Sequence, residues 1–277
     1  MNTIIRDGYT LQYRQLGDSN QSPIIVIGSA FYYPRLFQNP IFKTLNLIFI
    51  DHRGFSQSTD PNAGFQLADI VEDIEAIRTE LGIKQAYFLG HSGHGFMAMA
   101  YAEKYPEHVA GMILSNLAPT NTKERQDGSI AHFENSASDE RKHYFYQEIA
   151  KLESDITNDP QHRFTHINVR MQAHSFYQYD YDGAYLWDDV INNMPVLDYL
   201  WGVAFAEFDT KAFIEKCTMP IKLLLSEYDY LVSPITLWDS ILENTNIQPV
   251  IFHRSGHNPM LEEPENYYQA LTTFIQQ

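Results

Sequence analysis

One serine of this chain lies in a local pattern typical of a catalytic nucleophile. The apolar run at residues 86–89 leads directly into the glycine-rich stretch Gly-His-Ser-Gly-His-Gly at residues 90–95, and a segment of small and apolar residues follows. A strand, a sharp turn with Ser92 at its tip, and a helix together make a nucleophile elbow, which exposes the serine hydroxyl at the end of a sheet. A serine hydroxyl is a weak nucleophile at neutral pH, so it needs a base and a group that orients the base.

Two further residues downstream could complete this chemistry. Asp229 ends the segment Ser-Glu-Tyr-Asp, which directly follows the apolar run at residues 221–225. His257 lies just beyond the short apolar run at residues 250–252. Ser92, Asp229 and His257 are therefore each expected on a loop that follows a strand. The carboxyl ends of parallel strands meet at one edge of a sheet, which is where the sites of such proteins lie.

The chain offers competitors for the base and for the acid. His253 lies only four residues before His257, at the end of the same apolar run, and we expect it to be packed or solvated. Glu227 and Asp209 are weaker alternatives to Asp229. An acid could also follow the preceding strand, but that position holds Asn116, which cannot carry a charge.

Taken together, these motifs resemble the α/β-hydrolase superfamily, in its branch with a serine nucleophile and a lid. Besides the elbow, the resemblance rests on three segments, DHRGFSQS at 51–58, SEYD at 226–229 and SGHNPMLEEP at 255–264. The first of these is similar to the D-x-R-G-x-G-x-S loop of the family, in which Arg53 would brace the backbone. The resemblance implies Ser92 as nucleophile, His257 as base and Asp229 as acid.

When the serine attacks, negative charge develops on the carbonyl oxygen of the substrate. Two backbone N–H donors are needed to stabilise this charge, each worth about 3 kcal/mol. Gly93, which follows the nucleophile, is expected to provide one. The other should come from the loop after residues 24–27, where family members usually have His-Gly-x. This chain has Gly28-Ser29-Ala30 there, so we expect the N–H of Ala30, with the Ser29 side chain as an alternative.

Candidate pocket residues are Ser29, Phe31, His91 and His94. His94 departs from the pattern G-x-S-x-G, which requires a small residue at its position because the helix start packs closely against a strand. Gly93 and Gly95 on either side could relieve the crowding. Two interpretations remain open. Either His94 is a local variant of the elbow, or it is a second histidine that tunes the specificity or the pKa values of the site.

The elements that must position these residues can be read from the hydrophobic pattern. Short apolar runs predict strands at residues 10–15, 24–27, 45–50, 86–89, 111–115, 221–225 and 250–252. Helices are predicted at residues 68–81, 234–242 and 265–275, and another follows Ser92. Buried apolar strands that alternate with helices imply an α/β fold with a mostly parallel sheet, covered by helices on both faces.

The pattern changes between residues 121 and 209, which contain scattered aromatic residues among charges and no buried-strand run. We expect a mainly helical lid insertion there, and an α/β-hydrolase core formed by residues 1–120 and 210–277. Residues 121–215 carry 17 acidic and 8 basic side chains, a balance of −9 out of −16 for the whole chain.

A net charge of −16 disfavours nucleic acids and anionic membranes as partners, because phosphate groups would be repelled. The sequence has no run of about 18 apolar residues that could span a bilayer and no pattern of a secretory signal. The single cysteine, Cys217, cannot form an internal disulfide. These features predict a cytoplasmic protein.

We therefore expect a serine hydrolase that cleaves a small-molecule ester or amide through an acyl-enzyme, without a cofactor or a metal. His162 and His166 have helical spacing, but no Glu lies between them in H-E-x-x-H form and no third ligand is evident. Two enzymatic alternatives remain, an aminopeptidase like the proline iminopeptidases and a hydrolase of carbon–carbon bonds. The non-enzymatic alternative is a ligand-sensing or partner-binding protein on the same scaffold.

Overall fold

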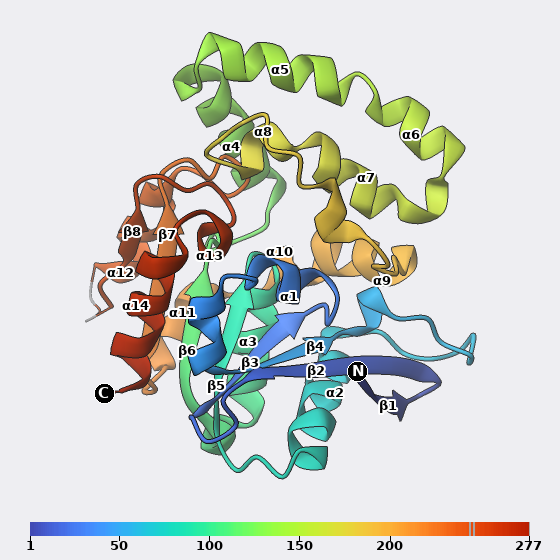
Figure 1. Ribbon diagram of the computed structural model, residues 1–277, viewed down its shortest axis with the longest axis vertical. Coiled ribbons are helices and arrows are strands. Elements are labelled where there is room, and N and C mark those ends of the chain that lie inside the picture. The colour runs from blue at the N-terminus through green and yellow to red at the C-terminus, as the bar shows by residue number, and fades with distance from the viewer. Residues whose placement is uncertain (244, 246, 277) are drawn as a thin grey trace.

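A computed structural model describes residues 1–243, 245 and 247–276. Its centre is an eight-stranded sheet with the strand order β1-β2-β4-β3-β5-β6-β7-β8 (Figure 1). The strands are β1 Asn2–Arg6, β2 Tyr9–Gly17, β3 Pro23–Gly28, β4 Asn46–Asp51, β5 Ala86–His91, β6 Val109–Ser115, β7 Ile221–Ser226 and β8 Val250–Phe252. All strands that the sequence predicted are present.

Strands β3 to β8 are parallel, and β2 pairs antiparallel with both β1 and β4. Strand β1 was not predicted. It joins β2 through a tight turn in which Asp7 and Gly8 have φ values of 48° and 78°. It lies at the edge of the sheet, where its side chains are mostly exposed. An edge strand has only one neighbour, and this one lacks the buried apolar run that marks the central strands.

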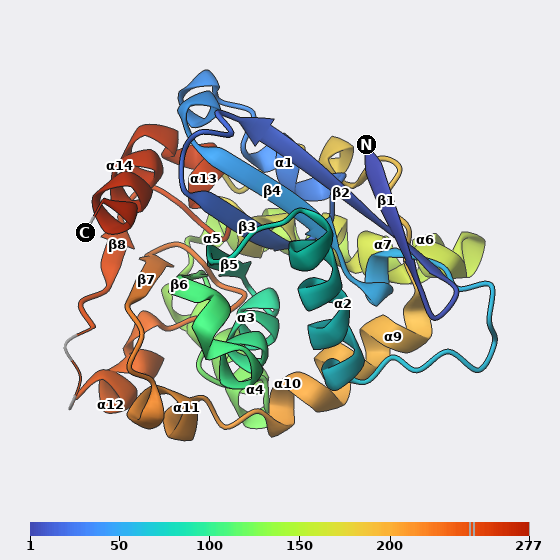
Figure 2. The same ribbon diagram turned by 90° about the horizontal axis from the view of Figure 1, so that it is seen from below.

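Helices cover both faces of the sheet, which confirms the predicted fold class. Helices α2 (Leu67–Glu80) and α3 (His94–Lys104) lie on one face, and α1 (Tyr32–Leu36) and α14 (Pro264–Ile275) lie on the other (Figure 2). The central strands are apolar on both sides, because alternate residues of a strand point to opposite faces. In β3, Ile25 and Ile27 pack toward α2 and α3, whereas Ile24 and Val26 pack toward α1 and α14.

A helical insertion (residues 123–216) connects β6 to β7. Figure 1 shows that most of it lies across the end of the sheet where the parallel strands terminate. Its helices are α4 Lys123–Ser136, α5 Asp139–Ile149, α6 Leu152–Asn158, η4 Pro160–His162, α7 Arg163–Arg170, α8 Gln172–Ser175, η5 Ala184–Trp187, α9 Met194–Tyr199, the π-helical turn η6 Leu200–Ala204, α10 Phe205–Glu207 and α11 Thr210–Lys216. The last of these returns to the core and packs beside α3.

The remaining elements are short helices in the connections of the core. They are η1 Pro40–Thr44, η2 Arg53–Phe55, η3 Pro106–His108, η7 Ile235–Trp238, α12 Asp239–Leu242 and α13 Pro259–Glu262. The helix predicted at residues 234–242 is thus a 3-10 turn followed by a short α-helix. Among the residues that the structure describes, no helix has both the length and the apolar character needed to cross a bilayer.

Candidate active site

Ser92 lies at the tip of a sharp turn between β5 and α3. Its φ is +56°, a left-handed conformation that a residue with a side chain rarely adopts. The backbone N–H of Ser92 donates to the carbonyl of Ser115 at the end of β6, 2.9 Å away, which holds the turn against the neighbouring strand. The Ser92 side chain is partly exposed. A strained, solvent-reachable serine in this position is the geometry of a nucleophile elbow.

The second glycine of the elbow pattern stands one position late, at Gly95 instead of residue 94, and this shift has a steric explanation. A Cβ atom on Gly90 would lie 2.5 Å from the Cα of Gly95, so strand and helix touch at these two glycines. The small residue that the turn requires is therefore Gly95, and position 94 can carry a large side chain. The ring of His94 is buried, and its Nδ1 atom lies 2.8 Å from the hydroxyl of Tyr33 in α1. Burial lowers the pKa of His94 to about 4.

Asp229 and His257 come together at the same edge of the sheet. His257 follows β8 and Asp229 follows β7, and the His257 Nδ1 atom lies 2.7 Å from Asp229 Oδ2. Both side chains are buried. The ring of His91, next to Ser92 in the chain, lies 4.5 Å from the ring of His257, measured between centroids. The structure thus places the predicted base beside both the predicted acid and the elbow.

Asn116 holds the Asp229 carboxylate, a contact that the sequence analysis missed. It follows β6 with a φ of 49°. Its side-chain amide donates to Asp229 Oδ2 at 2.9 Å, to Ser226 Oγ at 2.9 Å and to the Gly256 carbonyl at 3.1 Å. These contacts fix the orientation of the Asp229 carboxylate. The sequence feature that could have revealed this contact is the position of Asn116 directly after β6. A carboxylate there would compete with Asp229 for His257, whereas an amide can only hydrogen-bond to Asp229.

The loop that carries His257 is held from two directions. The Glu262 carboxylate accepts from the N–H of Gly256 at 2.8 Å and from the N–H of Tyr177 in the insertion at 2.7 Å. Burial raises the pKa of Glu262 to about 8. The N–H of His257 itself donates to the Ser175 carbonyl, 2.6 Å away. The main chain of His257 is therefore hydrogen-bonded directly to the helical insertion.

The competing candidates have other partners. His253 is exposed and pairs with the exposed Glu227, with 2.9 Å between His253 Nδ1 and Glu227 Oε2. Asp209 caps α11 by accepting from the N–H of Ala212 at 2.9 Å. These contacts leave Asp229 as the carboxylate that pairs with His257.

Arg53 is fully buried and braces the core, in agreement with its predicted role. Its guanidinium donates to both carboxylate oxygens of Asp73 on α2, at 2.5 and 2.8 Å, and to Asp7 in the turn after β1, at 2.6 Å. It also donates to the carbonyl of Gly64. Two loops and a helix are thereby tied to the segment after β4.

The loop after β3 requires a correction. The N–H of Ala30 donates to the buried Asp51 carboxylate at 2.7 Å, so it is not free to bind a substrate oxygen. Burial raises the pKa of Asp51 to about 7. The Ser29 hydroxyl accepts from the N–H of Phe31 and of Tyr32, both at 3.2 Å, so it acts as an acceptor toward the start of α1. The expected donor from this loop is therefore not Ala30.

Gly93 is the N-cap residue of α3. The first N–H groups of a helix have no acceptor within the helix, so the start of a helix can supply donors to an anion. A Cβ atom on Gly93 would lie 2.7 Å from the Phe205 ring and 3.1 Å from the Trp201 ring. The insertion therefore packs directly onto the elbow.

Aromatic side chains of the core and the insertion form an apolar cluster, which we call the aromatic wall and which includes Trp201 beside Gly93. Its members are Phe31, Phe55, Phe164, Trp187 and Trp201. The Phe164 ring lies 4.9 Å from Trp201, 5.8 Å from Trp187 and 6.0 Å from Phe55, measured between centroids. Trp201 belongs to the π-helical turn η6, and such turns often lie at functional sites. The sequence showed these aromatic residues but not that they gather here.

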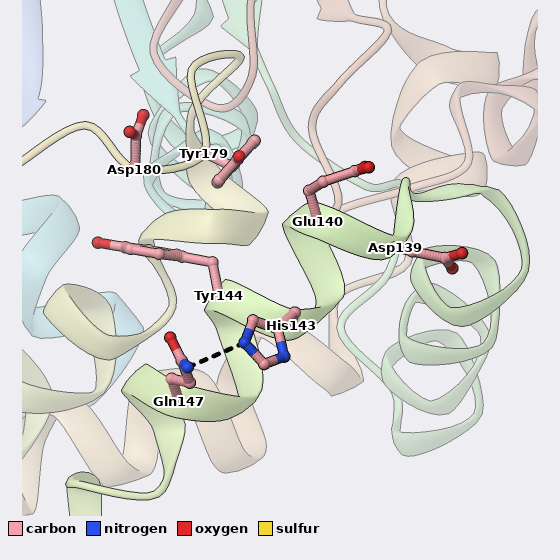
Figure 3. A pocket seen from close by; sticks show the side chains of 7 residues that line it. All are labelled: Asp139, Glu140, His143, Tyr144, Gln147, Tyr179 and Asp180. Carbon is pink, nitrogen blue, oxygen red and sulfur yellow. Dashed lines mark hydrogen bonds between the residues drawn. The ribbon is translucent and has the colours of Figure 1, made fainter.

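Two surface grooves lie on the insertion. The larger, about 500 Å³, is lined by Asp139, Glu140, His143, Tyr144, Gln147, Tyr179 and Asp180, as Figure 3 shows. The smaller, about 370 Å³, is lined by Asp159, His162, Thr165, His166, Trp187, Asp189, Val190 and Ile191. Neither groove is lined by Ser92, Asp229 or His257, so we do not assign the predicted chemistry to them.

The two histidines that the sequence showed at helical spacing face a single carboxylate. His162 Nδ1 lies 2.9 Å and His166 Nε2 lies 3.3 Å from Asp159 Oδ2. Within the described part of the chain, no group of three or more His, Cys, Asp or Glu side chains could hold a metal ion.

The chain is similar to known proteins in sequence and in fold. A family model described as alpha/beta hydrolase fold matches residues 27–264. The chain is 44% identical over 277 residues to the AB hydrolase superfamily protein YclE of Bacillus subtilis, with 98% of this chain and 97% of that protein covered. A proline iminopeptidase of Saccharolobus solfataricus is 24% identical over 258 residues, with 84% and 76% covered. An esterase from Exiguobacterium antarcticum has a similar structure, with a TM-score of 0.70, 18% identity and 98% and 97% covered.

Proposed function

Because the chain belongs to the α/β-hydrolase family, we propose that it is a serine hydrolase that cleaves a small ester or amide through an acyl-enzyme. The observation that carries the proposal is the buried pair of His257 and Asp229, with 2.7 Å between Nδ1 and Oδ2, beside the strained turn of Ser92. In support of the proposal, the three residues follow three different strands, β5, β7 and β8, which run parallel and end at the same edge of the sheet. No other described carboxylate pairs with the ring of His257.

In the proposed mechanism, His257 Nε2 removes the proton of the Ser92 hydroxyl while the serine oxygen attacks the substrate carbonyl carbon. Asp229 accepts the Nδ1 hydrogen bond, which selects the tautomer with a free Nε2 and stabilises the imidazolium. The protonated ring then donates its proton to the leaving alcohol or amine, and an ester forms on Ser92. A water molecule, activated by the same ring, hydrolyses this ester and restores the serine.

We propose the N–H groups of Gly93 and Phe31 as the oxyanion donors. Gly93 begins α3, so the helix dipole also favours negative charge there. Phe31 replaces Ala30 in this proposal, because Ala30 donates to Asp51 at 2.7 Å. The N–H of Phe31 donates to the Ser29 hydroxyl at 3.2 Å, a long contact that a charged oxygen could displace.

Residues 121–209 are proposed to act as a lid, and residues 1–120 and 210–277 as the catalytic core. Residues 244, 246 and 277 of this core lie outside the described part. The support is that Trp201 and Phe205 of the insertion contact the elbow at Gly93. The aromatic wall favours a substrate with an apolar group next to the scissile bond, because rings bury such groups well.

An aminopeptidase of the proline iminopeptidase type is the second candidate, favoured by the relatives of that name and by the acidic insertion. Such an enzyme needs free carboxylates to bind a substrate ammonium group. Several carboxylates of the insertion are already paired, since Arg170 binds Glu148 and Asp155, both at 2.6 Å, and Arg163 binds Asp198. These pairs favour the ester or amide hydrolase over the aminopeptidase.

The test is hydrolysis of p-nitrophenyl acetate and butyrate, with proline p-nitroanilide as the aminopeptidase substrate. The proposal expects ester turnover and covalent labelling by a fluorophosphonate probe, both abolished by Ser92→Ala and unaffected by Ser154→Ala on the exposed side of α6. Turnover of the anilide alone would favour the aminopeptidase. Absence of both labelling and turnover would favour a ligand-sensing protein, and a panel of lactones and vinylogous ketones would then be screened for binding.

A further inference from the structure

Four buried side chains outside the proposed triad form a continuous row of hydrogen bonds that ends on the main chain of His257. They come from four separate parts of the core, the loop after β4, the start of α3, helix α1 and the end of β5. In order, the contacts are Gly54 N to His52 Nδ1 at 2.9 Å, His52 Nε2 to His94 Nε2 at 3.1 Å, His94 Nδ1 to Tyr33 Oη at 2.8 Å, Tyr33 Oη to His91 Nδ1 at 3.1 Å, and His91 Nε2 to the His257 carbonyl at 2.6 Å.

The first end of the row determines the protons on two rings. The backbone N–H of Gly54 can only donate, so His52 Nδ1 accepts and carries no proton. In a neutral imidazole the proton is then on the other nitrogen, so His52 Nε2 donates to His94 Nε2. His94 must therefore carry its own proton on Nδ1, and this atom also lies 3.0 Å from the His91 carbonyl, which can only accept.

The second end leads independently to the same arrangement. The carbonyl of His257 can only accept, so His91 Nε2 carries the proton and His91 Nδ1 is bare. The Tyr33 hydroxyl then donates to His91 Nδ1 and accepts from His94 Nδ1. The assignments from the two ends give the same direction of donation, from Gly54 N–H toward the His257 carbonyl. Each contact along the row then contains one proton.

This arrangement requires uncharged histidines. A second proton on His52 Nδ1 would face the Gly54 N–H, and one on His94 Nε2 would face the donor of His52. The surroundings oppose such protons, because burial lowers the pKa of His52 and His91 well below the usual range of histidine and that of His94 to about 4. All four side chains of the row are at most 5% exposed. Buried hydrogen-bond networks in which every member is satisfied are rigid.

We propose that this row, the histidine relay of His52, His94, Tyr33 and His91, positions His257 relative to the elbow. The inference rests on the proposed function, in which His257 is the base. His94 is then a positioning residue, which gives a reason for an imidazole at a position where the elbow pattern has glycine. Displacement of a catalytic group by about 1 Å can reduce a rate on the order of a hundredfold, so the anchoring of the His257 main chain has a direct consequence for turnover.

The test removes one hydroxyl group. Tyr33→Phe deletes the central oxygen of the relay and retains the ring. The matched control is Tyr101→Phe in α3, which also removes a buried hydroxyl, one that donates to Glu75 at 2.7 Å. For hydrolysis of p-nitrophenyl butyrate, Tyr33→Phe is expected to lower kcat about tenfold with KM within about twofold, because a shift smaller than 1 Å costs less than the hundredfold limit. Tyr101→Phe should leave kcat unchanged.

A spectroscopic readout tests the relay independently of activity. Nitrogen-15 NMR of the histidine rings should show the proton on Nε2 in His52 and His91 and on Nδ1 in His94, and Tyr33→Phe should alter the signals of His91 and His94. A different tautomer of His94, or equal kcat values for Tyr33→Phe and Tyr101→Phe in an active protein, would overturn the proposal. An inactive wild type with these tautomers would instead refute the proposed function, and the positioning role with it.

Discussion

The contact between the insertion and the elbow leads to a quantitative prediction for Gly93→Ala. The new Cβ atom would lie 2.7 Å from Phe205 Cε2 and 3.0 Å from Phe205 Cδ2, whereas ordinary carbon–carbon contacts are about 3.5 to 4.0 Å. Phe205 is fully buried and stacks on Phe96 with 5.1 Å between ring centroids, so it has little room to move. The backbone of Gly93, with a φ of −52°, would itself accept an alanine.

Overpacking of a buried contact costs about 1 to 3 kcal/mol. Replacement of glycine by alanine where the backbone permits it gains about 0.4 to 1 kcal/mol through the unfolded state. Gly93→Ala is therefore expected to lower the free energy of unfolding by about 1 to 2 kcal/mol, because the first effect exceeds the second. Gly128→Ala on α4 is the control, since a Cβ atom there would meet nothing within 4 Å, and it should be neutral or stabilising.

A double-mutant cycle with Phe205→Leu identifies the cause. Leucine lacks the ring atoms that Gly93→Ala would contact, so the double variant should lose at least about 1 kcal/mol less than the sum of the two single variants. Urea unfolding followed by circular dichroism gives all four free energies. Additivity to within about 0.5 kcal/mol would refute the reasoning, because residues that clash must be coupled.

Three further variants test other contacts. Asn116→Ala removes the amide that donates to Asp229. A hydrogen bond to a charged group is worth about 1.5 to 3 kcal/mol, so urea unfolding should show a free energy of unfolding lower by at least about 1.5 kcal/mol. A decrease below about 1 kcal/mol would contradict this. Glu262 has its pKa raised to about 8 in the folded protein, so its contribution to stability is present at low pH and is lost as pH rises toward 8. The thermal midpoint of Glu262→Gln should therefore fall less than that of the wild type between pH 5 and 8.5. Parallel plots of thermal midpoint against pH for the two proteins would disprove this. Arg141 is buried and donates to the carbonyls of Ala173, Phe176 and Tyr177. Arg141→Met should lower the free energy of unfolding by about 3 kcal/mol and speed proteolysis near these three residues. An unchanged rate of proteolysis would argue against a role of Arg141 in holding this segment.

Much of the fold could be predicted because its strands are short apolar runs with clear ends. Residues 86–89 and 221–225 are two such runs, and each leads into a candidate site residue. Parallel strands bring their carboxyl ends to one edge, which is why the sequence predicts Asp229 and His257 near each other. The helical character of residues 121–209 followed from the lack of buried-strand runs.

The missed features depend on contacts between distant parts of the chain. Ala30 could be assigned to the loop after β3, but the direction of its N–H depends on Asp51, which reaches it from the neighbouring strand β4. The partners of His94 are similarly dispersed, since Tyr33 and His52 come from other elements. Spacing along the chain describes local periodicity and cannot indicate which side chains meet across a core.

The hydrogen bond from His257 N–H to the Ser175 carbonyl has a consequence for the evolution and engineering of this protein. A Cβ atom on Gly256 would lie 2.4 Å from that same carbonyl, so the loop of His257 and the end of α8 fit together closely. The insertion is therefore not an interchangeable module. A chimera that took residues 121–209 from a relative would retain the shape of the base loop only if the donor segment presented a carbonyl at the position of Ser175. With the aromatic wall in its proposed role, substrate range should thus evolve through single substitutions in the wall more readily than through exchange of the whole segment.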